Sequence, residues 1–567
     1  MNSENSKTLM MNQQSAEAGR GVFKEVLEEE SKRPMELQEE LLFSLLQDNK
    51  DTEYGKKYDF ASIDSIEAYQ KQVPVITYDN IAEYIERMKE GGKDLLTAYP
   101  FDHMNETSGT VGVPKYIPMT NKQTQVFMKY NYHYLSGIKA ELLDPAWLKG
   151  RTFCTAEGNY TTLPSGITIG CASSKMAETV GGLDAFDNMM RAIFTSPIEA
   201  TAPNEGTDTK YIHLRFALMD KEITGIVTSF YSMVTHLLQY FADNYEMFIN
   251  DIEMGTIDDS VRIPDDVREK LLKKIEPMPE RAAELREIFK DGADFPFLHA
   301  VWPNLMYIGG VGAASFSIYS DKIRDRFGKL TNLYSGITAS EGLWSVPIEM
   351  DNPNSMLAAG SAFMEFLPVE AGDDFSQAVT MDKLEVNKIY ELIITNLSGF
   401  YRYRMSDAVK VTGFKNKTPL VQFMYRVNKT INLIAEKTTE AAIDATVRNT
   451  AEKMGFALSD YCVYPDPDTS PNKYVFLIEP AVEGSIKDMD ALAKTIYDEI
   501  SVANPVFREC VEEGDLQKPE VHLLQPETAL LYRDMMIFKG SSASQLKPVH
   551  VISNEIQRRF FFELSEN

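Results

Sequence analysis

The sequence has few of the residues that build metal centres and disulfide frameworks. Its 567 residues include four cysteines without a C-x-x-C pair and seven histidines without an H-E-x-x-H pattern. Neither a zinc site nor a disulfide framework is indicated, and the thiols are expected to be reduced and mostly packed. The cysteines are Cys154, Cys171, Cys462 and Cys510.

Long hydrophobic runs are also missing. No apolar run reaches the roughly 18 residues that would indicate a membrane-spanning helix. The first five residues, Met1–Asn5, lack the basic region and apolar core of a signal peptide. The sequence therefore predicts a soluble, cytoplasmic protein that does not associate with a membrane.

Positive charge is scarce relative to negative charge. The chain has 57 lysines and arginines against 84 aspartates and glutamates, a net charge of -27, and a pI near 4.8. Nucleic acids and anionic membranes select basic surfaces, so this composition disfavours both as general partners. An anionic nucleotide would have to be held by locally placed lysines and arginines.

The length and the pattern of the chain indicate two α/β domains. A hydrophobic content of 44% and a charged content of 25% are ordinary for a globular protein, and 567 residues are too many for one core. A short polar joint at Tyr425–Lys429 separates residues 1–428, a large N-terminal domain, from residues 429–567, a smaller C-terminal domain.

Several elements can be predicted from local patterns. Phe363–Leu367 and Tyr390–Thr395 are rich in apolar and β-branched residues and are predicted strands. Tyr211–Leu218 is also predicted as a strand. Thr439 is a predicted N-cap of the helix that follows it.

One stretch, T-S-G-T-V-G-V-P-K at residues 107–115, has the composition of a phosphate-binding loop. Glycines let backbone amides approach an anion, hydroxyls add donors, and a lysine adds a mobile positive charge. It is not a Walker loop, because Pro114 and Tyr116 flank Lys115 where glycine and a hydroxyl residue are required. It matches T-S-G-T-x-G-x-P-K, the phosphate loop of adenylate-forming enzymes, and the alternative is a hydroxyl-rich surface turn.

Three further segments follow in a fixed order. They are T-A-S-E-G at residues 338–342, F-Y-R-Y-R-M-S-D at 400–407 and Q-L-K-P at 545–548. Together with the loop they resemble the Gretchen Hagen three family of acyl-acid amido synthetases, a branch of the adenylate-forming superfamily. Smaller landmarks match at similar intervals: Y-x-H-L at 211–214, W-P at 302–303, E-F-L-P at 365–368 and E-K-T-T-E at 436–440. The resemblance covers nearly the whole chain, and it implies an adenylate-forming α/β fold with mixed sheets and a mobile C-terminal lid.

The resemblance also implies roles for individual residues. The loop would hold the β- and γ-phosphates of ATP, Glu341 would bind Mg²⁺, and Ser340 would lie beside the nucleotide. Asp407 would accept hydrogen bonds from the ribose hydroxyls. The loop residues concerned are Thr107, Ser108, Gly109, Thr110, Gly112 and Lys115.

Three basic residues complete the implied nucleotide site. Arg426 matches an arginine that reaches the ribose, and Lys437 matches the lysine just beyond it. Lys547 matches a C-terminal lysine that neutralises the α-phosphate during adenylation, which requires its domain to close over the site. For Arg426 and Lys437 a surface salt bridge is the alternative interpretation.

The sequence departs from the family pattern at three positions. Val111 replaces a small hydroxyl residue, and Ser406 replaces the glycine before the ribose aspartate. Ile337 stands where a tyrosine usually stacks near the adenine, and Tyr334 is a possible substitute. No charge is lost, so nucleotide binding is expected to be retained.

The acyl-binding residues are less clearly marked. Ser229, Phe230 and Tyr231 fall where family members line the acyl site. An aromatic set at the start of a buried helix is equally typical of core packing, so both interpretations stay open.

The implied reaction begins with ATP and a carboxylic acid, which form an acyl-adenylate and pyrophosphate. An amine, for which an amino acid is expected, then attacks the adenylate to give an amide and AMP. An acyl-CoA synthetase would share the first step, but coenzyme A favours a basic tunnel mouth, which an acidic chain does not suggest. A catalytically silent nucleotide- or acyl-binding protein would have no use for Lys115, Glu341, Asp407 and Lys547 together.

Overall fold

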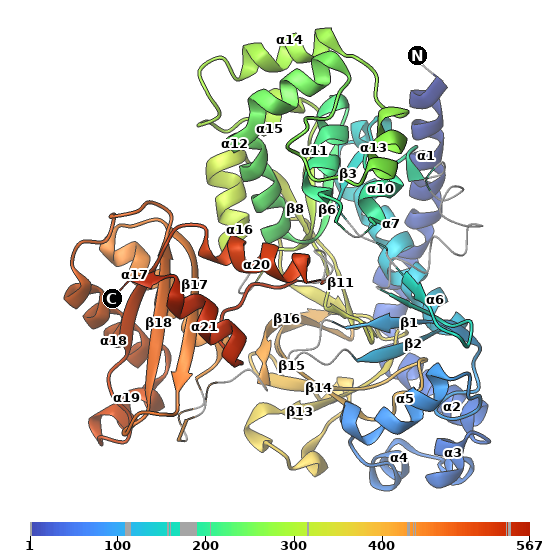
Figure 1. The fold of residues 1–567 in the computed structure, drawn as a ribbon. Helices are drawn as coiled ribbons and strands as arrows, with labels where there is room; N and C mark the ends of the chain where they lie inside the picture. The colour runs from blue at the N-terminus through green and yellow to red at the C-terminus, as the bar shows by residue number, and fades with distance from the viewer. Residues whose placement is uncertain are drawn as a thin grey trace. The chain divides into compact units, whose positions relative to one another are not determined.

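The computed structural model forms two compact units. It describes residues 3–107, 115–155, 158, 160–170, 187, 190–204, 206–313, 317–427, 431, 433–434, 436, 438–539, 541 and 546–566. Most of the chain up to Gln422 belongs to the first unit, and Phe423–Asn567 with Ser406–Ala408 belongs to the second. Figure 1 labels the helices and strands along the chain.

The first unit contains a parallel sheet of strand order β3-β6-β7-β8 among the described residues. Its strands are Thr152–Cys154, Gly225–Phe230, Tyr307–Val311 and Thr331–Tyr334. Parallel neighbours need crossover connections, and the helices between these strands supply them. The longest is α12, Tyr231–Met254, which begins directly after β6 and packs against that strand and against α14, Pro279–Ile288.

A second, mostly antiparallel sheet has the order β11-β12-β16-β15-β14-β13. Its strands are Ser345–Pro347, Ser355–Leu357, Thr418–Arg426, Tyr403–Lys415, Ile389–Thr395 and Phe363–Pro368. The predictions of strands at Phe363–Leu367 and Tyr390–Thr395 are confirmed, and these strands pair with each other. Helix α2, Pro34–Asn49, packs on β13, where the buried amide of Gln38 donates to the carbonyl oxygen of Ala362 at 2.6 Å.

A third sheet of order β2-β1-β5-β4 carries the predicted phosphate loop. Strands β1, Phe101–Glu106, and β2, Tyr116–Thr120, pair antiparallel, and the loop joins them. Strand β5, Thr168–Gly170, pairs parallel with β1, and β4, Tyr160–Thr162, pairs antiparallel with β5.

The second unit is a sheet of order β17-β18-β19-β20 with helices on both faces. The strands are Leu458–Asp466, Lys473–Pro480, Glu520–Leu524 and Ser565–Glu566. Successive residues of a strand point to opposite faces. Accordingly Val463 and Phe476 pack with α17, Glu440–Met454, and α18, Met489–Ala503. Cys462 and Val475 pack instead with α20, Thr528–Phe538, and α21, Glu555–Glu563.

Two local predictions have opposite outcomes. Thr439 caps α17 as predicted, since its hydroxyl oxygen accepts a hydrogen bond of 3.2 Å from the amide of Ala442. Tyr211–Leu218 was wrongly predicted as a strand and lies in helix α11, Thr209–Met219. Every residue from Tyr211 to Leu218 is buried, so the segment shows no helical periodicity, and an apolar run alone does not distinguish the two structures.

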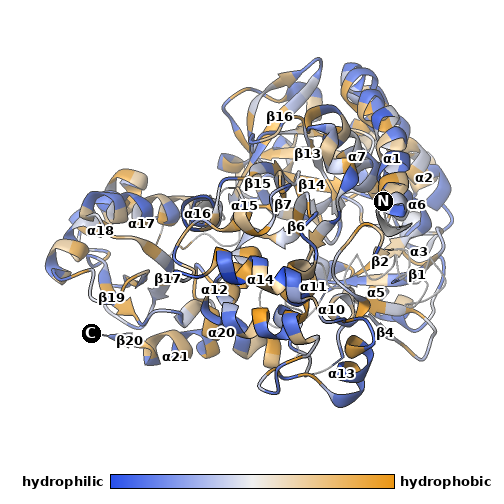
Figure 2. Ribbon diagram, turned by 90° about the horizontal axis from the view of Figure 1, so that it is seen from above, coloured by the Kyte–Doolittle hydropathy of each residue, from blue (hydrophilic) through white to orange (hydrophobic). Residues whose placement is uncertain are grey.

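The described cysteines are buried, and the described helices are mixed in polarity. Cys154, Cys462 and Cys510 are buried and form no disulfide within the described part of the chain, whereas Cys171 lies outside it. Helices such as α14 mix hydrophilic and hydrophobic residues along their length (Figure 2). Within the described ranges, no helix is both long enough and apolar enough to cross a membrane.

Candidate active site

The base of the predicted phosphate loop is closed by hydrogen bonds between its two ends. The amide of Thr107 donates to the carbonyl oxygen of Lys115 at 2.9 Å, and the amide of Lys115 lies 3.4 Å from the hydroxyl oxygen of Thr107. The antiparallel pairing of β1 and β2 therefore continues to the ends of the loop. The remaining predicted loop residues, Ser108, Gly109, Thr110 and Gly112, lie outside the described residues, as does Val111.

Tyr78 supports the lysine end of the loop. Its hydroxyl oxygen accepts a hydrogen bond of 2.9 Å from the amide of Tyr116, and its ring centroid lies 5.5 Å from Nζ of Lys115. Burial raises the pKa of Tyr78 to about 12, so the hydroxyl stays neutral at physiological pH. Lys115 forms no ion pair with a described carboxylate. Its ammonium group is thus held by a ring face and is available for an anion.

Ser340 and Glu341 form the turn of a two-residue hairpin. Strand β9, Thr338–Ala339, pairs antiparallel with β10, Gly342–Leu343, and the side chain of Glu341 is buried. A Cβ atom at Gly342 would lie 2.6 Å from the ring of Trp344, so the glycine of the T-A-S-E-G segment is required by packing.

Two buried asparagines hold this turn against the loop and the central sheet. Asn105, near the end of β1, donates from Nδ2 to the carbonyl oxygen of Ser340 at 2.9 Å. Asn396, directly after β14, donates to the carbonyl oxygen of Glu341 at 2.8 Å. Strand β1, which leads into the phosphate loop, is therefore in direct contact through Asn105 with the turn of the T-A-S-E-G segment, more than 200 residues away in the chain. Sequence reasoning missed both asparagines.

The oxygen atoms at this turn suit a hard cation. Glu341 supplies a carboxylate, and Oδ1 of Asn105 is buried without a hydrogen-bond partner in the described residues. Mg²⁺ prefers oxygen ligands and usually takes only one or two carboxylates together with substrate phosphates. Across the described residues no group of three or more histidines, cysteines, aspartates or glutamates could hold a metal ion. The donor set thus fits Mg²⁺ shared with phosphates and does not form a closed cage.

The predicted ribose residues meet in the second unit. Nε of Arg426, at the end of β16, donates to Oδ1 of Asp407, in β15, at 2.8 Å. The carboxylate side chain is 5% exposed and the guanidinium side chain 31% exposed. Ser406, which precedes Asp407, has a φ of 60°, a left-handed conformation that favours glycine. The backbone of Ser406, which stands where the family has glycine, is therefore strained.

The arginines of the F-Y-R-Y-R segment are structural. Arg402 forms a two-pronged ion pair with Glu365, with contacts of 3.0 and 2.9 Å, and it also donates to the carbonyl oxygens of Gln70 and Val73. Arg404 forms a similar two-pronged ion pair with Glu391. Their contacts are Nε to Oε1 at 2.7 Å and Nη2 to Oε2 at 2.9 Å. These interactions clamp the N-terminal segment and two strands to β15.

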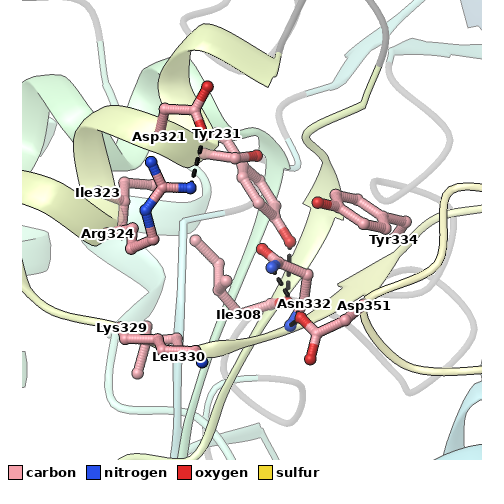
Figure 3. Close-up of a pocket in the computed structure, with 11 residues that line it drawn as sticks. Tyr231, Ile308, Asp321, Ile323, Arg324, Lys329, Leu330, Asn332, Tyr334 and Asp351 are labelled. Atoms are coloured by element: carbon pink, nitrogen blue, oxygen red, sulfur yellow. Dashed lines mark hydrogen bonds and ion pairs between the residues drawn. The ribbon is translucent and has the colours of Figure 1, made fainter.

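The predicted acyl residues separate in the structure. Tyr231 is completely buried, and its hydroxyl donates to the carbonyl oxygen of Ile308 at 3.0 Å. It lines a cavity of about 330 Å³ (Figure 3), whereas Ser229 and Phe230 do not. The ring of Tyr334 faces that of Tyr231 at 6.1 Å. The other lining residues are Ile308, Ser320, Asp321, Ile323, Arg324, Lys329, Leu330, Asn332 and Asp351.

Two of the charged side chains of this cavity pair with each other, and a third accepts a hydrogen bond from an asparagine. Arg324 pairs with Asp321 at 2.7 Å, and Asn332 donates from Nδ2 to Asp351 at 2.8 Å (Figure 3). The cavity therefore combines an aromatic wall with a polar rim, and Arg324 on that rim also donates to Asp325 outside the cavity, at 2.7 Å.

The remaining predicted residues lie in the second unit. Lys547 is exposed in the segment between α20 and α21. Lys437 lies outside the described residues, so its role stays a prediction.

The sequence matches family models along most of its length. The GH3 family N-terminal domain matches residues 23–332, the GH3 family central domain matches 355–426, and the GH3 family C-terminal domain matches 441–556.

Individual proteins show the same similarity. A probable indole-3-acetic acid-amido synthetase GH3.1 of Arabidopsis thaliana is 24% identical over 539 residues, covering 92% of this chain and 90% of the relative. A jasmonoyl–L-amino acid synthetase GH3.5 of Oryza sativa subsp. japonica is 24% identical over 550 residues, covering 90% and 91%.

Solved structures confirm the predicted fold class. The GH3.15 acyl acid amido synthetase superposes with a TM-score of 0.84 at 21% identity, covering 95% of this chain and 96% of the other. A 2-hydroxyisobutyryl-CoA ligase in its postadenylation state superposes with a TM-score of 0.56 at 13% identity, covering 95% and 94%. At these identities the likeness concerns the fold alone: an α/β adenylate-forming architecture with a large N-terminal and a smaller C-terminal domain.

Proposed function

The chain belongs to the GH3 family of adenylate-forming amido synthetases, and from this premise we propose the reaction that it catalyses. It activates a carboxylic acid with ATP, releases pyrophosphate, and transfers the acyl group from the adenylate to an amine. The amine is an amino acid, as in the names of the jasmonoyl–L-amino acid synthetases similar to this chain.

The observation that carries this proposal is the hydrogen bond from Asn105 to the carbonyl oxygen of Ser340. It brings the base of the phosphate loop next to the turn that bears Glu341. A phosphate-binding loop beside a buried carboxylate is the arrangement needed to hold a nucleoside triphosphate with its cation. Bound Mg²⁺ would neutralise phosphate charge, with Glu341 as its protein ligand.

In the first step, a carboxylate oxygen attacks the α-phosphorus of ATP and pyrophosphate leaves. Both reactants are anionic, so the step needs charge neutralisation and alignment. Lys115 binds the departing β- and γ-phosphates, together with the loop residues Thr107, Ser108, Gly109, Thr110 and Gly112. Lys547 neutralises the charge of the α-phosphate. The C-terminal domain, residues 429–567, acts as a lid whose closure brings Lys547 to the nucleotide.

The nucleotide is held at its other end by the ribose pair. Arg426 orients the carboxylate of Asp407 through Oδ1, and the carboxylate accepts hydrogen bonds from the ribose hydroxyls. Lys437 and Ser340 complete the nucleotide contacts. Ser229, Phe230 and Tyr231 contact the acyl group in this proposal, and the cavity that Tyr231 lines, without Ser229 and Phe230, provides space for part of it.

In the second step, a neutral amine attacks the carbonyl carbon of the adenylate. A tetrahedral intermediate collapses, AMP leaves with the electron pair of the broken C–O bond, and the amine loses a proton to give the amide. An ammonium group has no lone pair to attack with, so this step needs the free base.

The proposal is tested by ATP–pyrophosphate exchange over a panel of acids, followed by product mass. The panel contains indole-3-acetic acid, jasmonic acid, 4-substituted benzoates and 2,4-DB, which appear in the names of similar proteins. Exchange with at least one acid and an N-acyl amino acid product are expected, with amide yield rising from about pH 7 to 9 as free amine becomes available.

Coenzyme A is the matched alternative acceptor in that experiment. With a net charge of -27, the chain is expected to form little thioester, because coenzyme A carries phosphates. An acyl-CoA product with no amide from any amino acid would assign the protein to the thioester-forming branch. Unchanged ATP and acid under all conditions would instead indicate a nucleotide- or acyl-binding protein without catalysis.

A further inference from the structure

A buried histidine lies three residues after Lys547. His550 is 3% exposed, with Nδ1 3.3 Å from Oε1 of Glu440 and Nε2 3.8 Å from Oδ1 of Asp460. Its ring stacks on that of Tyr461, with centroids 4.5 Å apart and planes inclined by 12°. The imidazole is therefore enclosed by the start of α17 on one side and by β17 on the other.

The backbone around His550 is attached to the edge of the second unit's sheet. The amide of Val463, in β17, donates to the carbonyl oxygen of His550, and the amide of Ile552 donates to the carbonyl oxygen of Val463, both at 2.9 Å. Three residues of extended chain span at most about 11 Å. The anchored pair thus limits how far the backbone of Lys547 can stray from β17.

Charge balance around the imidazole favours its protonated form. The negative charges of three carboxylates, those of Glu440, Asp444 and Asp460, act on it, and Arg448 pairs with Asp444 at 2.9 Å. The hydroxyl of Tyr461 also donates to Asp444, at 3.1 Å. Burial by itself lowers the pKa of His550, but the contact with Glu440 and the charges of Asp460 and Asp444 outweigh it and raise the pKa above its usual value.

We infer that His550, as an imidazolium between Glu440 and Asp460, is a positioning residue that fixes the segment carrying Lys547. The inference rests on the proposed function, because the role of Lys547 gives the segment its catalytic purpose. Loss of the proton would remove the positive charge that lies between the carboxylates of Glu440 and Asp460 inside the fold, which is unfavourable. Since the folded-state pKa is raised, the stabilisation is complete at low pH and is lost as pH rises through that folded-state pKa.

The test measures adenylation alone, by ATP–pyrophosphate exchange with the full chain across pH 6 to 10. Exchange does not involve the acceptor amine, so amine deprotonation cannot contribute. Wild type should lose kcat on the alkaline side. Glu440→Gln should move this loss to lower pH by about one unit, because a neighbouring negative charge is removed. His550→Gln should lower kcat about tenfold, abolish the alkaline loss and leave KM for ATP within about twofold.

His522→Gln is the matched control. His522 also contacts a glutamate, Glu520, at 2.6 Å, but it lies in β19. Its pH profile should coincide with that of the wild type. If the profiles of Glu440→Gln and the wild type coincide instead, the inference is overturned. Should His550→Gln fail to fold, as judged by its thermal unfolding, Glu440→Gln and Asp460→Asn carry the same comparison.

A second readout separates this inference from the proposed function. As pH rises, amide hydrogen exchange of the peptide 546–552 should accelerate in both proteins. The pH at which it accelerates should be lower in Glu440→Gln than in the wild type, whether or not the protein is catalytically active. If no acid supports pyrophosphate exchange in the wild type, the proposed function fails. The amide exchange of residues 546–552 still measures whether His550 fixes this segment. Equal amide exchange in the two proteins at every pH would overturn the inference by itself.

Discussion

Arg426 and Asp407 are joined by a hydrogen bond of 2.8 Å between Nε and Oδ1, although nineteen residues separate them in the chain. The guanidinium group orients a carboxylate that is almost fully buried. Only one carboxylate oxygen is used by this bond, so the other remains for a ligand hydroxyl. A salt bridge and a ribose contact are therefore compatible roles for the same pair.

Replacing Asp407 should weaken nucleotide binding through the ribose. We expect Asp407→Ala to lower the affinity for ATP by about 2–3 kcal/mol, the scale of charge-assisted hydrogen bonds. Calorimetric titration with ATP and with 2′-deoxy-ATP measures this, and deoxy-ATP should lose much less affinity in the variant than ATP does. The exposed Asp259→Ala is the control. Equal losses for both nucleotides would remove Asp407 from the ribose.

Replacing Lys547 should affect rate far more than binding. A charge that arrives only when the lid closes stabilises the transition state more than the bound ground state. Lys547→Ala should nearly abolish pyrophosphate exchange while ATP binds within a few-fold of wild type. Lys539→Ala, an exposed lysine in the same unit, should retain exchange. A parallel collapse of ATP affinity would contradict this division of labour.

Replacing Glu341 should alter the response to magnesium. Glu341→Gln keeps the backbone carbonyl that Asn396 holds but loses the anionic ligand. The Mg²⁺ concentration for half-maximal pyrophosphate exchange should rise several-fold, and removal of Mg²⁺ with a chelator should stop exchange in both proteins. Glu349→Gln, an exposed glutamate nearby in sequence, should respond as wild type does. An unchanged Mg²⁺ requirement in Glu341→Gln would exclude Glu341 as the ligand.

Breaking the buried pair of Arg402 and Glu365 should destabilise the first unit. The two side chains are 4% and 1% exposed, so Glu365→Gln leaves a buried guanidinium without its counter-charge, at a cost of about 3–5 kcal/mol. All three tryptophans, Trp147, Trp302 and Trp344, belong to this unit, so their fluorescence in a urea titration reports its unfolding.

The control for that titration is the exposed ion pair between Lys388 and Glu385. Surface ion pairs contribute little, so Glu385→Gln should leave the urea midpoint unchanged. Equal midpoints for Glu365→Gln and wild type would mean that the buried pair is dispensable.

Relieving the strain at Ser406 should stabilise the protein slightly. A left-handed conformation costs a non-glycine residue about 1–2 kcal/mol, and glycine gives back roughly 0.5–1 kcal/mol through its larger unfolded-state entropy. Ser406→Gly should therefore gain about 0.5 kcal/mol, whereas Ser406→Val should lose more than about 1 kcal/mol. Scanning calorimetry of the three proteins measures the order, and a valine variant as stable as wild type would contradict the strain.

Elements with a local signature could be predicted from the sequence. The hydroxyl of Thr439 at a helix start and the β-branched run Tyr390–Thr395 both specify their structure through neighbouring residues. Tyr211–Leu218 could not be assigned, because a helix that is buried on all sides carries no amphipathic period. Its start was marked by Asp208, whose side chain accepts from the amide of Tyr211 at 3.3 Å.

The order of motifs in the sequence leads to Lys115, Glu341 and Asp407 as reactive residues, and their roles stay predictions. It does not lead to the residues that support them. Asn105 left one weak signal, an asparagine inside a strand, where that residue is uncommon. Its partner Ser340 lies 235 residues away, and no local pattern reports such a contact.

The hydrogen bonds of Arg402 join parts of the chain that the ribosome makes at different times. Its guanidinium group bonds to the carbonyl oxygens of Gln70 and Val73, which precede it by 332 and 329 residues. Synthesis proceeds at about 5–20 residues per second, so Arg402 is made roughly 15–65 seconds after these carbonyl groups. During that interval the N-terminal segment exposes apolar surface that β13 and β15 will later cover. Slow translation before residue 402, or truncation there, would therefore leave nascent chains that need a chaperone to stay soluble.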